Sequence, residues 1–417
     1  MSDVENVTNV NFVDTAKTFL RDLVRTAPFA VWVVLRFFLP KRKPDEDAPD
    51  LTKGAVLVFA TNPIGDTVTL LPALQLLMKN QWPMKVDLLA RPKTAPLFKF
   101  VPGVGDVITL EKLNFPFQLR ALRSNISTLW ELRHRRYQSA IIFTSNFWTA
   151  WVAFLIGAQN RYGFSRSEKV GLATINDFGF LLTHDKRGIR NSDRVGGFFE
   201  FLEWLKVSSG AADKLPRLSI NGAGLKGALG KQIKTIAGEK QMVVLNPFAT
   251  QKIREWPLEH WIKLANSLAQ NRVPVVLCCD PAQRDRFDGG VTALRPEVLV
   301  LSDLSFEQFI GLLNKAAVVV TNDSGPLHLG YALRKPTVAI IGPTDPDNVV
   351  PKGADVTVVQ RQMDCAPCSH LGSFERCPLT HHRCVKDINV DEVMTPIMAH
   401  LRSNEFRAGA GVDSACA

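Results

Sequence analysis

The stretch from Thr321 to Gly330 (TNDSGPLHLG) is the part of the sequence best suited to hold an anion. It follows the apolar run AVVVT and opens a run of small residues in a helical pattern. At such a turn the backbone N–H groups of Ser324 and Gly325 point outward, with the positive end of the helix dipole behind them, as in phosphate sites. We therefore predict that Asp323, Ser324 and Gly325 contact a phosphate-bearing ligand.

His328 lies one helical turn into this segment. A lone histidine there is more often a satisfied core residue, but its place beside Asp-Ser-Gly at a strand-to-helix turn favours contact with the same ligand. After the next apolar run comes Gly342-Pro343-Thr344-Asp345-Pro346, a tight turn at the same sheet edge. This turn either closes over the ligand or is simply a turn.

A second polar loop runs from Asn246 to Pro257 (NPFATQKIREWP) and follows another apolar run. Thr250 offers a hydroxyl donor, and Lys252 and Arg254 would neutralise the charge of a diphosphate. The alternative is an ordinary solvated basic loop, and the loop taken alone fits both interpretations.

The first core strand that the sequence predicts ends in Thr61 to Thr67 (TNPIGDT), and a helical pattern follows. Gly65 permits a tight turn and places Asp66 at or near the helix N-terminus. Asp66 is either a helix cap, which its residue type alone favours, or a general base that faces the ligand. One glycine stands where the dinucleotide fingerprint G-x-G-x-x-G has three, so an NAD-dependent dehydrogenase is disfavoured.

Four of the seven cysteines form a compact set, Cys365, Cys368, Cys377 and Cys384. In a cytoplasmic chain this spacing favours a structural Zn²⁺ or iron site over disulfides, with disulfides or free thiols as the alternative. The set follows the last predicted strand, so a structural or lid role is expected rather than a catalytic one.

Short apolar runs that alternate with helical patterns position these turns. The runs begin at Ala55, Lys85, Asp106 and Ser139 in the first half, and at Gln241, Val273, Glu297, Ala317 and Thr337 in the second. Two such series predict two doubly wound domains with parallel sheets. Ligands of such sheets bind at the carboxyl ends of strands, so the cleft between the domains is the predicted site.

The N-terminal part of the chain combines apolar and basic residues. The run from Ala27 to Pro40 (APFAVWVVLRFFLP) is shorter than the ~20 apolar residues that span a bilayer. From Thr15 to Lys43 there are seven basic residues and one acidic residue, which gives 7 − 1 = +6. We predict an amphipathic helical extension on an anionic membrane surface, the alternative being a helix packed on the protein. The polar, acidic start (MSDVENVTNV) has no secretory signal, which predicts a cytoplasmic location.

Composition sets the outer limits of the interpretation. The chain has 417 residues, 46% hydrophobic and 22% charged, which suits two domains with large cores. The formal net charge of +10 favours anionic partners such as nucleotide phosphates, phosphorylated glycans or anionic lipids. No Lys/Arg run is interleaved with aromatic residues, so nucleic acid is not an expected partner.

Together these elements resemble glycosyltransferase family 9, the heptosyltransferases that build the lipopolysaccharide inner core. The resemblance rests on Ile64-Gly65-Asp66 with Leu71-Pro72-Ala73-Leu74, the Thr250 to Pro257 loop, Asp323 to His328 with Gly342-Pro343-Thr344, and the cysteine segment, which a subset of members carries. It extends from about Ala55 to about Met398. It implies a GT-B fold (α/β, two Rossmann-like domains facing a central cleft) and metal-independent inverting transfer from a nucleotide diphosphate sugar, usually ADP-heptose.

The resemblance also implies roles for residues. Asp66 matches the presumed base, Thr250 and Arg254 match the diphosphate contacts, and Asp323, Ser324, Gly325 and His328 match the rest of the nucleotide pocket. Two positions depart from the family. Arg254 replaces a phosphate-contacting lysine, and a forked guanidinium is not equivalent to a point charge. The acidic nucleoside contact is displaced, with Asp280 and Asp285 as candidates.

We therefore predict an N-terminal membrane-interface extension and linker (1–53), an acceptor-binding domain (54–235), a nucleotide-sugar-binding domain that includes the Cys-rich segment 365–384 (236–390), and a C-terminal helix with a tail (391–417). The predicted enzyme transfers heptose from ADP-heptose to a lipopolysaccharide-core or other surface-glycan acceptor, at the inner face of the inner membrane. The alternatives are another GT-B enzyme, such as a sugar-nucleotide 2-epimerase, or a non-catalytic, membrane-associated protein that binds nucleotide sugar.

Overall fold

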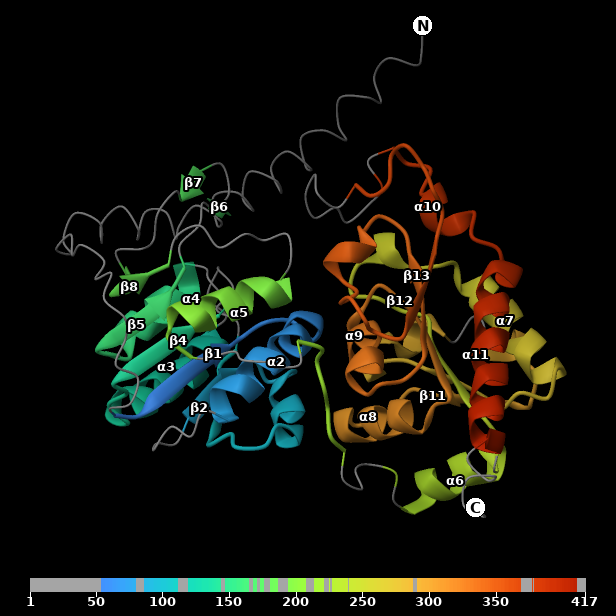
Figure 1. The fold of residues 1–417 in the computed structure, drawn as a ribbon, viewed down its shortest axis with the longest axis horizontal. Helices are drawn as coiled ribbons and strands as arrows, with labels where there is room; N and C mark the ends of the chain where they lie inside the picture. The colour runs from blue at the N-terminus through green and yellow to red at the C-terminus, as the bar shows by residue number, and fades with distance from the viewer. Residues whose placement is uncertain are drawn as a thin grey trace, which may run out of the picture.

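Figure 1 shows the computed structural model of the chain as two α/β halves that lie side by side. The structure describes residues 54–79, 86–111, 119–143, 147–164, 168–170, 173–175, 181–186, 194–207, 214–220, 225, 227–238, 240–287, 291–368, 377 and 379–410. The predicted extension over residues 1–53 and the tail after residue 410 lie outside this description. In the described part of the chain, no helix is both long enough and apolar enough to cross a membrane.

The first half is built on a parallel six-stranded sheet in the order β3-β2-β1-β4-β5-β8. Its strands are β1 (Val56–Ala60), β2 (Val86–Ala90), β3 (Val107–Thr109), β4 (Ser139–Ile142), β5 (Asn160–Gly163) and β8 (His184–Asp185). Its helices are α2 (Ile64–Lys79), α3 (Leu119–His134), α4 (Phe147–Leu155) and α5 (Arg194–Trp204). An antiparallel pair, β6 (Glu168–Val170) and β7 (Ala173–Ile175), lies outside the sheet.

The second half repeats this plan in the order β11-β10-β9-β12-β13-β14, again all parallel. Its strands are β9 (Val243–Asn246), β10 (Val275–Cys278), β11 (Val298–Leu301), β12 (Val318–Asn322), β13 (Thr337–Ile341) and β14 (Val356–Gln360). Its helices are α6 (Gly227–Ala237), α7 (Leu258–Gln270), α8 (Phe306–Lys315), α9 (Gly325–Ala332), α10 (Arg383–Lys386) and α11 (Val390–Ala410). Both strand orders follow the Rossmann pattern, which confirms the predicted fold class.

Apolar side chains on both faces explain why the central strands form. In β1, Val56, Val58 and Ala60 join the core with α2 and α5, whereas Leu57 and Phe59 join the core with α3 and α4. All nine predicted strands are present. The sequence interpretation missed β5, β8 and β14, and also the short pair β6 and β7. Strands β8 and β14 lie at sheet edges and bury less surface, and β5 (NRYG) begins with two polar residues.

The predicted domain boundaries remain predictions, although two helices bear on them. Helix α6 runs across the predicted boundary between residues 235 and 236. Helix α11 packs against α7 and against β12 and β13, and its residues Val393, Ile397 and Leu401 join the core of the second half. The C-terminal helix is therefore an integral layer of that half (Figure 1).

The two halves meet where α2 packs on α9, and their hydrophobic cores are continuous through this contact (Figure 1). A Cβ atom placed on Gly65 would lie 2.7 Å from Cδ2 of His328, so only glycine permits this approach. An ion pair between Lys99 Nζ and Glu307 Oε1, 2.7 Å apart, also joins the halves.

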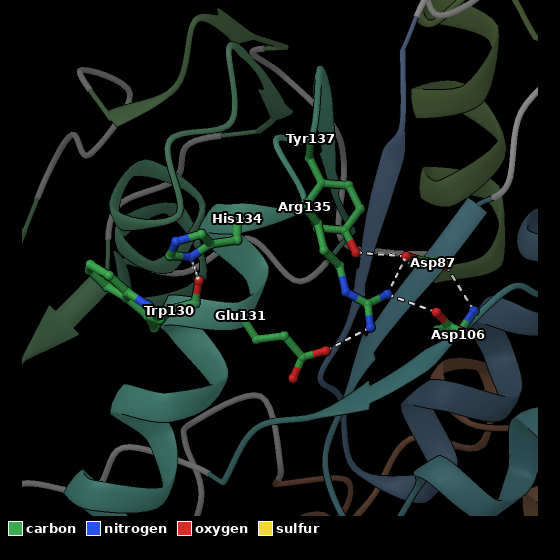
Figure 2. Close-up of polar contacts among 7 residues, drawn as sticks. All are labelled: Asp87, Asp106, Trp130, Glu131, His134, Arg135 and Tyr137. Atoms are coloured by element: carbon green, nitrogen blue, oxygen red, sulfur yellow. Dashed lines mark hydrogen bonds and ion pairs between the residues drawn. The ribbon is translucent and has the colours of Figure 1, made fainter.

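A polar network holds the opposite, amino edge of the first sheet together (Figure 2). Asp87 at the start of β2 accepts hydrogen bonds from the backbone N–H of Asp106 (2.8 Å), from Arg135 Nη1 (2.9 Å) and from the Tyr137 hydroxyl (2.7 Å). Arg135 also bonds Asp106 and Glu131. The segment before β4 is thereby tied to the starts of β2 and β3.

Candidate active site

The carboxyl ends of β9 and β12 lie side by side, because these strands pair in parallel with Thr321 opposite Asn246. The loop after each strand therefore opens at the same edge of the sheet. This position is the switch point of the strand order, where open α/β sheets bind ligands. The predicted motifs that include Arg254 and Asp323 follow these two strands.

We call residues 247–256 the β9 loop; Asn322, the last residue of β12, fixes both of its ends. The fully buried Asn322 donates from Nδ2 to the carbonyl of Pro247 (2.7 Å) and accepts through Oδ1 from the backbone N–H of Trp256 (3.0 Å). The sequence interpretation assigned Asn322 no role. Its place at the end of an apolar strand was visible, but its partners lie 66 and 75 positions earlier.

Glu255 closes the β9 loop on itself. Its carboxylate accepts from the backbone N–H of Ala249 (2.9 Å) and forms a two-pronged ion pair with Arg286. The Arg286 guanidinium also lies over the ring of Phe248, 4.3 Å from its centre. The loop is therefore a preorganised element rather than a solvated basic segment.

Arg254 Nη1 lies 3.0 Å from Asp323 Oδ2, so an ion pair joins the β9 loop to the end of β12 in the candidate site. Asp323 is only 1% exposed, yet neither of its carboxylate oxygens receives a hydrogen bond from the described residues. The contact with Arg254 is thus a charge pairing without hydrogen-bond geometry. A buried carboxylate in this state is costly, and groups of this kind point to a missing ligand.

Helix α9 begins directly beside this ion pair. Ser324 occupies its N-cap position but makes no capping bond, because its hydroxyl is engaged with Thr321 Oγ1 (3.1 Å) and the Asn322 carbonyl (3.3 Å). The Ser324 side chain therefore does not cap the start of α9, which suits an anion at this end.

The start of α2 brings Asp66 toward the start of α9. A Cβ atom on Gly325 would lie 3.4 Å from Ile64 Cγ2, and Gly65 abuts His328. Asp66 is the third residue of α2, so it lies inside the first turn and is not the N-cap. The half-buried Asp66 therefore lies near the contact between the halves, where the base role requires it.

His328 is 8% exposed and packs in the contact between α2 and α9. Its Nδ1 lies 2.6 Å from the Tyr331 hydroxyl, and the two rings are T-shaped. This placement supports an architectural part for His328 between the halves, and its predicted ligand contact stays a prediction.

The comparisons with known proteins identify the family. Residues 127–378, more than half of the chain, match the model of glycosyltransferase family 9 (heptosyltransferase). The chain belongs to this family. It is therefore a glycosyltransferase, as the sequence interpretation predicted.

Individual relatives match this family 9 chain over most of its length. Lipopolysaccharide heptosyltransferase 2 of Escherichia coli is 23% identical over 363 residues, 80% of this chain and 97% of that protein. The protein of the same name from Salmonella typhimurium is 24% identical over 318 residues, 73% of this chain and 87% of its own.

Two solved structures share the fold. The E. coli ADP-heptose lipopolysaccharide heptosyltransferase II has a TM-score of 0.65 at 19% identity and covers 84% of this chain and 99% of its own. The family 9 glycosyltransferase of Veillonella parvula has a TM-score of 0.68 at 17% identity and covers 86% of this chain and 100% of its own. These likenesses confirm the GT-B fold.

The remaining predicted donor residues of this family 9 enzyme lie at the same sheet edge. Thr250 and Lys252 are exposed on the β9 loop, Lys252 as the first residue of the 3-10 turn Lys252–Arg254. Asp280 follows β10 and caps the 3-10 turn Pro281–Arg286, with Oδ1 accepting from Ala282 N (2.9 Å). Asp285 is exposed within that turn. All four contacts with a donor stay predictions.

The four clustered cysteines of the family 9 chain line one cavity of about 280 Å³, together with Ile253, Pro343, His381 and His382. All four are free thiols. Burial, followed by the neighbouring thiols, raises the pKa of Cys368, and the same causes raise the pKa of Cys384 to about 11. Cys368 and Cys384 therefore each lie close to other thiols of the set. In the described part of the chain, however, no three His, Cys, Asp or Glu side chains are close enough to hold a metal ion.

Proposed function

We propose that this glycosyltransferase moves heptose from ADP-heptose to a lipopolysaccharide-core acceptor, with inversion at the anomeric carbon. The main support is the buried, unsatisfied carboxylate of Asp323, which pairs with Arg254 beside the uncapped start of α9. The relatives with long matches are named heptosyltransferases, and one solved relative is named for ADP-heptose.

The donor would bind across the β9 loop and α9. The diphosphate is anionic and fits the α9 N-terminus together with Arg254 and Lys252. Asp323 repels phosphate, so its two acceptor oxygens fit hydroxyl donors of the sugar or ribose instead. The carboxylate of Asp280 is our proposed nucleoside contact, and Thr250 adds a hydroxyl donor to the phosphates.

The chemical step is a single displacement. The acceptor hydroxyl oxygen forms a bond to the anomeric carbon while the bond from that carbon to the diphosphate oxygen breaks. Asp66 takes the hydroxyl proton as general base. The negative charge that develops on the leaving diphosphate is stabilised by Arg254, with Lys252, and by the N–H groups at Ser324 and Gly325, each well-placed donor being worth ~3 kcal/mol.

We further propose that the enzyme works at the inner face of the inner membrane, where it meets a lipid-linked acceptor. The support lies in the sequence, in the apolar run over residues 27–40 and the charge of +6 around it (7 − 1). Co-sedimentation of the full chain with anionic vesicles tests this proposal, and equal binding to zwitterionic vesicles would contradict it.

Metal enters this proposal only at the cysteines. No catalytic metal is proposed, because cationic side chains and a helix N-terminus meet the diphosphate; activity should persist in EDTA. The cysteine set fits Zn²⁺ or iron in its donor chemistry. Its arrangement does not fit, since no three candidate ligands converge within the described residues. We therefore route no step through a metal, and elemental analysis of the purified chain tests the structural site.

Thermal unfolding with ADP, UDP, GDP and CDP tests the donor first. A ligand at one hundred times its dissociation constant stabilises by ~2.7 kcal/mol, which raises the melting temperature measurably. Selective stabilisation by ADP supports ADP-heptose, whereas selective stabilisation by another nucleotide would replace the donor but keep the reaction.

Turnover with ADP-heptose, with and without acceptor, then separates the alternatives. The proposal requires ADP release that depends on the acceptor. An altered sugar product without acceptor would show an epimerase. Donor binding without any product would show a non-catalytic protein.

A further inference from the structure

The chain between β14 and α11 contacts two loops, the turn after β13 and the β9 loop, and the β9 loop belongs to the proposed donor site. Gln360 Nε2, at the end of β14, donates to the carbonyls of Gly342 (3.2 Å) and Thr344 (2.9 Å) in the turn after β13. The backbone N–H of Cys368 donates to the carbonyl of Pro343 (3.0 Å) in the same turn. The turn after β13 is therefore held by the cysteine-bearing segment.

Gly342 shows how closely this segment packs behind that turn. A Cβ atom there would lie 2.1 Å from Val385 Cγ2 and 3.3 Å from Cys384 Sγ. Any side chain at Gly342 would push α10 away from the sheet.

The same segment reaches the β9 loop through His382. Its Nε2 lies 2.5 Å from the backbone carbonyl of Ile253. A carbonyl oxygen only accepts, so Nε2 carries the proton and donates it in this bond. Ile253 is buried and directly precedes Arg254, the residue that pairs with Asp323. A second bond, from Trp256 Nε1 to the Ile388 carbonyl (2.8 Å), ties down the end of the loop.

The backbone of His382 is specialised for this contact. It has φ 53° and ψ 31°, in the left-handed region that non-glycine residues rarely adopt. His382 also occupies the N-cap position of α10, yet its side chain makes no capping bond. This unfavourable backbone conformation occurs at a residue whose side chain bonds the β9 loop and does not cap its own helix.

We propose that His382 is a positioning residue for the donor diphosphate: through the Ile253 carbonyl it fixes the 3-10 turn that presents Arg254 to the ligand. This inference rests on the proposed function. It makes the cysteine-lined cavity part of the donor-site scaffold, because Ile253 and His382 both line that cavity. His382 touches no reacting atom in this account and acts only through the loop.

The experiment measures the dissociation constant of ADP for the full chain by calorimetry, and the KM of donor and acceptor. His382→Ala removes the hydrogen bond to Ile253. Since a single such bond contributes ~0.5–1.5 kcal/mol, ADP affinity should fall by a factor of roughly 2 to 13, with a matching rise in donor KM and an unchanged acceptor KM. His382→Gln keeps an N–H donor on a side chain of similar reach and should restore part of the affinity.

His381→Ala is the matched control. His381 is the same residue type, lines the same cavity and lies with Nε2 3.9 Å from Cys365 Sγ. Among the described residues its ring bonds Cys365 and the backbone N–H of Arg383, and not the β9 loop. Its ADP affinity should stay within about twofold of wild type. A loss equal to that of His382→Ala would show general damage to the cavity and overturn the proposal.

A double-mutant cycle with Arg254→Ala tests whether His382 acts through Arg254. Once Arg254 is absent, His382→Ala should change ADP affinity by less than about twofold, since coupled residues are not additive. Full additivity would overturn the proposal, as would wild-type affinity in His382→Ala alone. If the wild-type chain bound no ADP, the proposed donor would fail and this inference with it, which distinguishes the two failures.

Discussion

Two aspartates of this enzyme are both buried and both paired with an arginine, but their carboxylates differ in hydrogen bonding. Asp87 at the amino edge of the first sheet is 6% exposed and lies 2.9 Å from Arg135; Asp323 at the carboxyl edge of the second is 1% exposed and lies 3.0 Å from Arg254. The two arginine side chains are 30% and 31% exposed. Burial and pairing therefore do not distinguish the sites.

Hydrogen bonding does distinguish them. Asp87 receives three hydrogen bonds, from the Asp106 backbone, Arg135 and Tyr137, as Figure 2 shows. Asp323 receives none from the described residues. A satisfied buried charge completes a fold, whereas an unsatisfied one costs stability that a bound ligand can recover. We infer that the first network serves the fold and the second serves the reaction.

Asp66→Asn gives the largest expected effect and extends the comparison to a third carboxylate. If Asp66 is the general base, kcat should fall by roughly 10²–10⁴-fold while ADP affinity stays unchanged. Steady-state kinetics and calorimetry measure the two quantities. Asp391→Asn is the control, because Asp391 also lies in the first turn of a helix, α11, on an exposed surface. Equal kinetics in both variants would show that Asp66 is not the general base and only interacts with the helix dipole.

Asp87→Asn should act on the fold alone. Breaking a buried pair removes about 3 kcal/mol from the free energy of unfolding, which lowers the melting temperature by roughly 6–12 °C. The ADP affinity and the KM values should not change below that temperature. Thermal unfolding with and without ADP measures this, and a lowered ADP affinity would mean that the amino-edge network is coupled to the site.

Asp323→Asn should show the reverse pattern. Because no hydrogen bond to Asp323 is lost and Arg254 is accessible to water, the unfolding free energy should stay within about 0.5 kcal/mol of wild type or rise. Turnover should fall by about 10–100-fold in kcat/KM, since a hydroxyl acceptor and the anchor of Arg254 are both weakened. A large loss of stability with normal kinetics would erase the difference between the two aspartates.

The sequence predicted the sheets and the place of the site for the same physical reason. Strands buried on both faces are continuous apolar runs, and the carboxyl ends of parallel strands share one edge of their sheet. This pattern predicts Arg254 and Asp323 at that edge of the second sheet and Asp66 at the corresponding edge of the first. Strand β5, next to the edge, and the edge strand β8 carry polar residues and gave no such pattern.

What the sequence could not predict depends on contacts between distant residues. Asn322 was visible as part of the motif, but its clamp on Pro247 and Trp256 exists only in the folded chain. His382 lies 129 positions from Ile253, and no local pattern links them. The unsatisfied state of Asp323 is likewise a property of three-dimensional geometry, and the sequence alone showed only an aspartate in a polar turn.

Tyr137→Phe gives the smallest expected effect and tests how fully Asp87 is satisfied. Asp87 keeps two of its three hydrogen bonds, so the loss at neutral pH should be about 1 kcal/mol of unfolding free energy. Burial, then the hydrogen bond to Asp87 and its negative charge, raises the pKa of Tyr137 above the ordinary value of 10.0. The folded protein therefore holds the phenol proton to a higher pH than the unfolded chain does.

The raised pKa of Tyr137 determines whether stability rises or falls at alkaline pH. The stabilisation linked to the Tyr137 proton is fully present below about pH 10 and is lost as the pH rises above it, because the unfolded chain then releases a proton that the folded protein keeps. The melting temperature of wild type should therefore fall more steeply than that of Tyr137→Phe between about pH 9 and about pH 11. Parallel curves would mean that the phenol is not held by Asp87, and the contrast with Asp323 would then rest on the bonds from Asp106 and Arg135 alone.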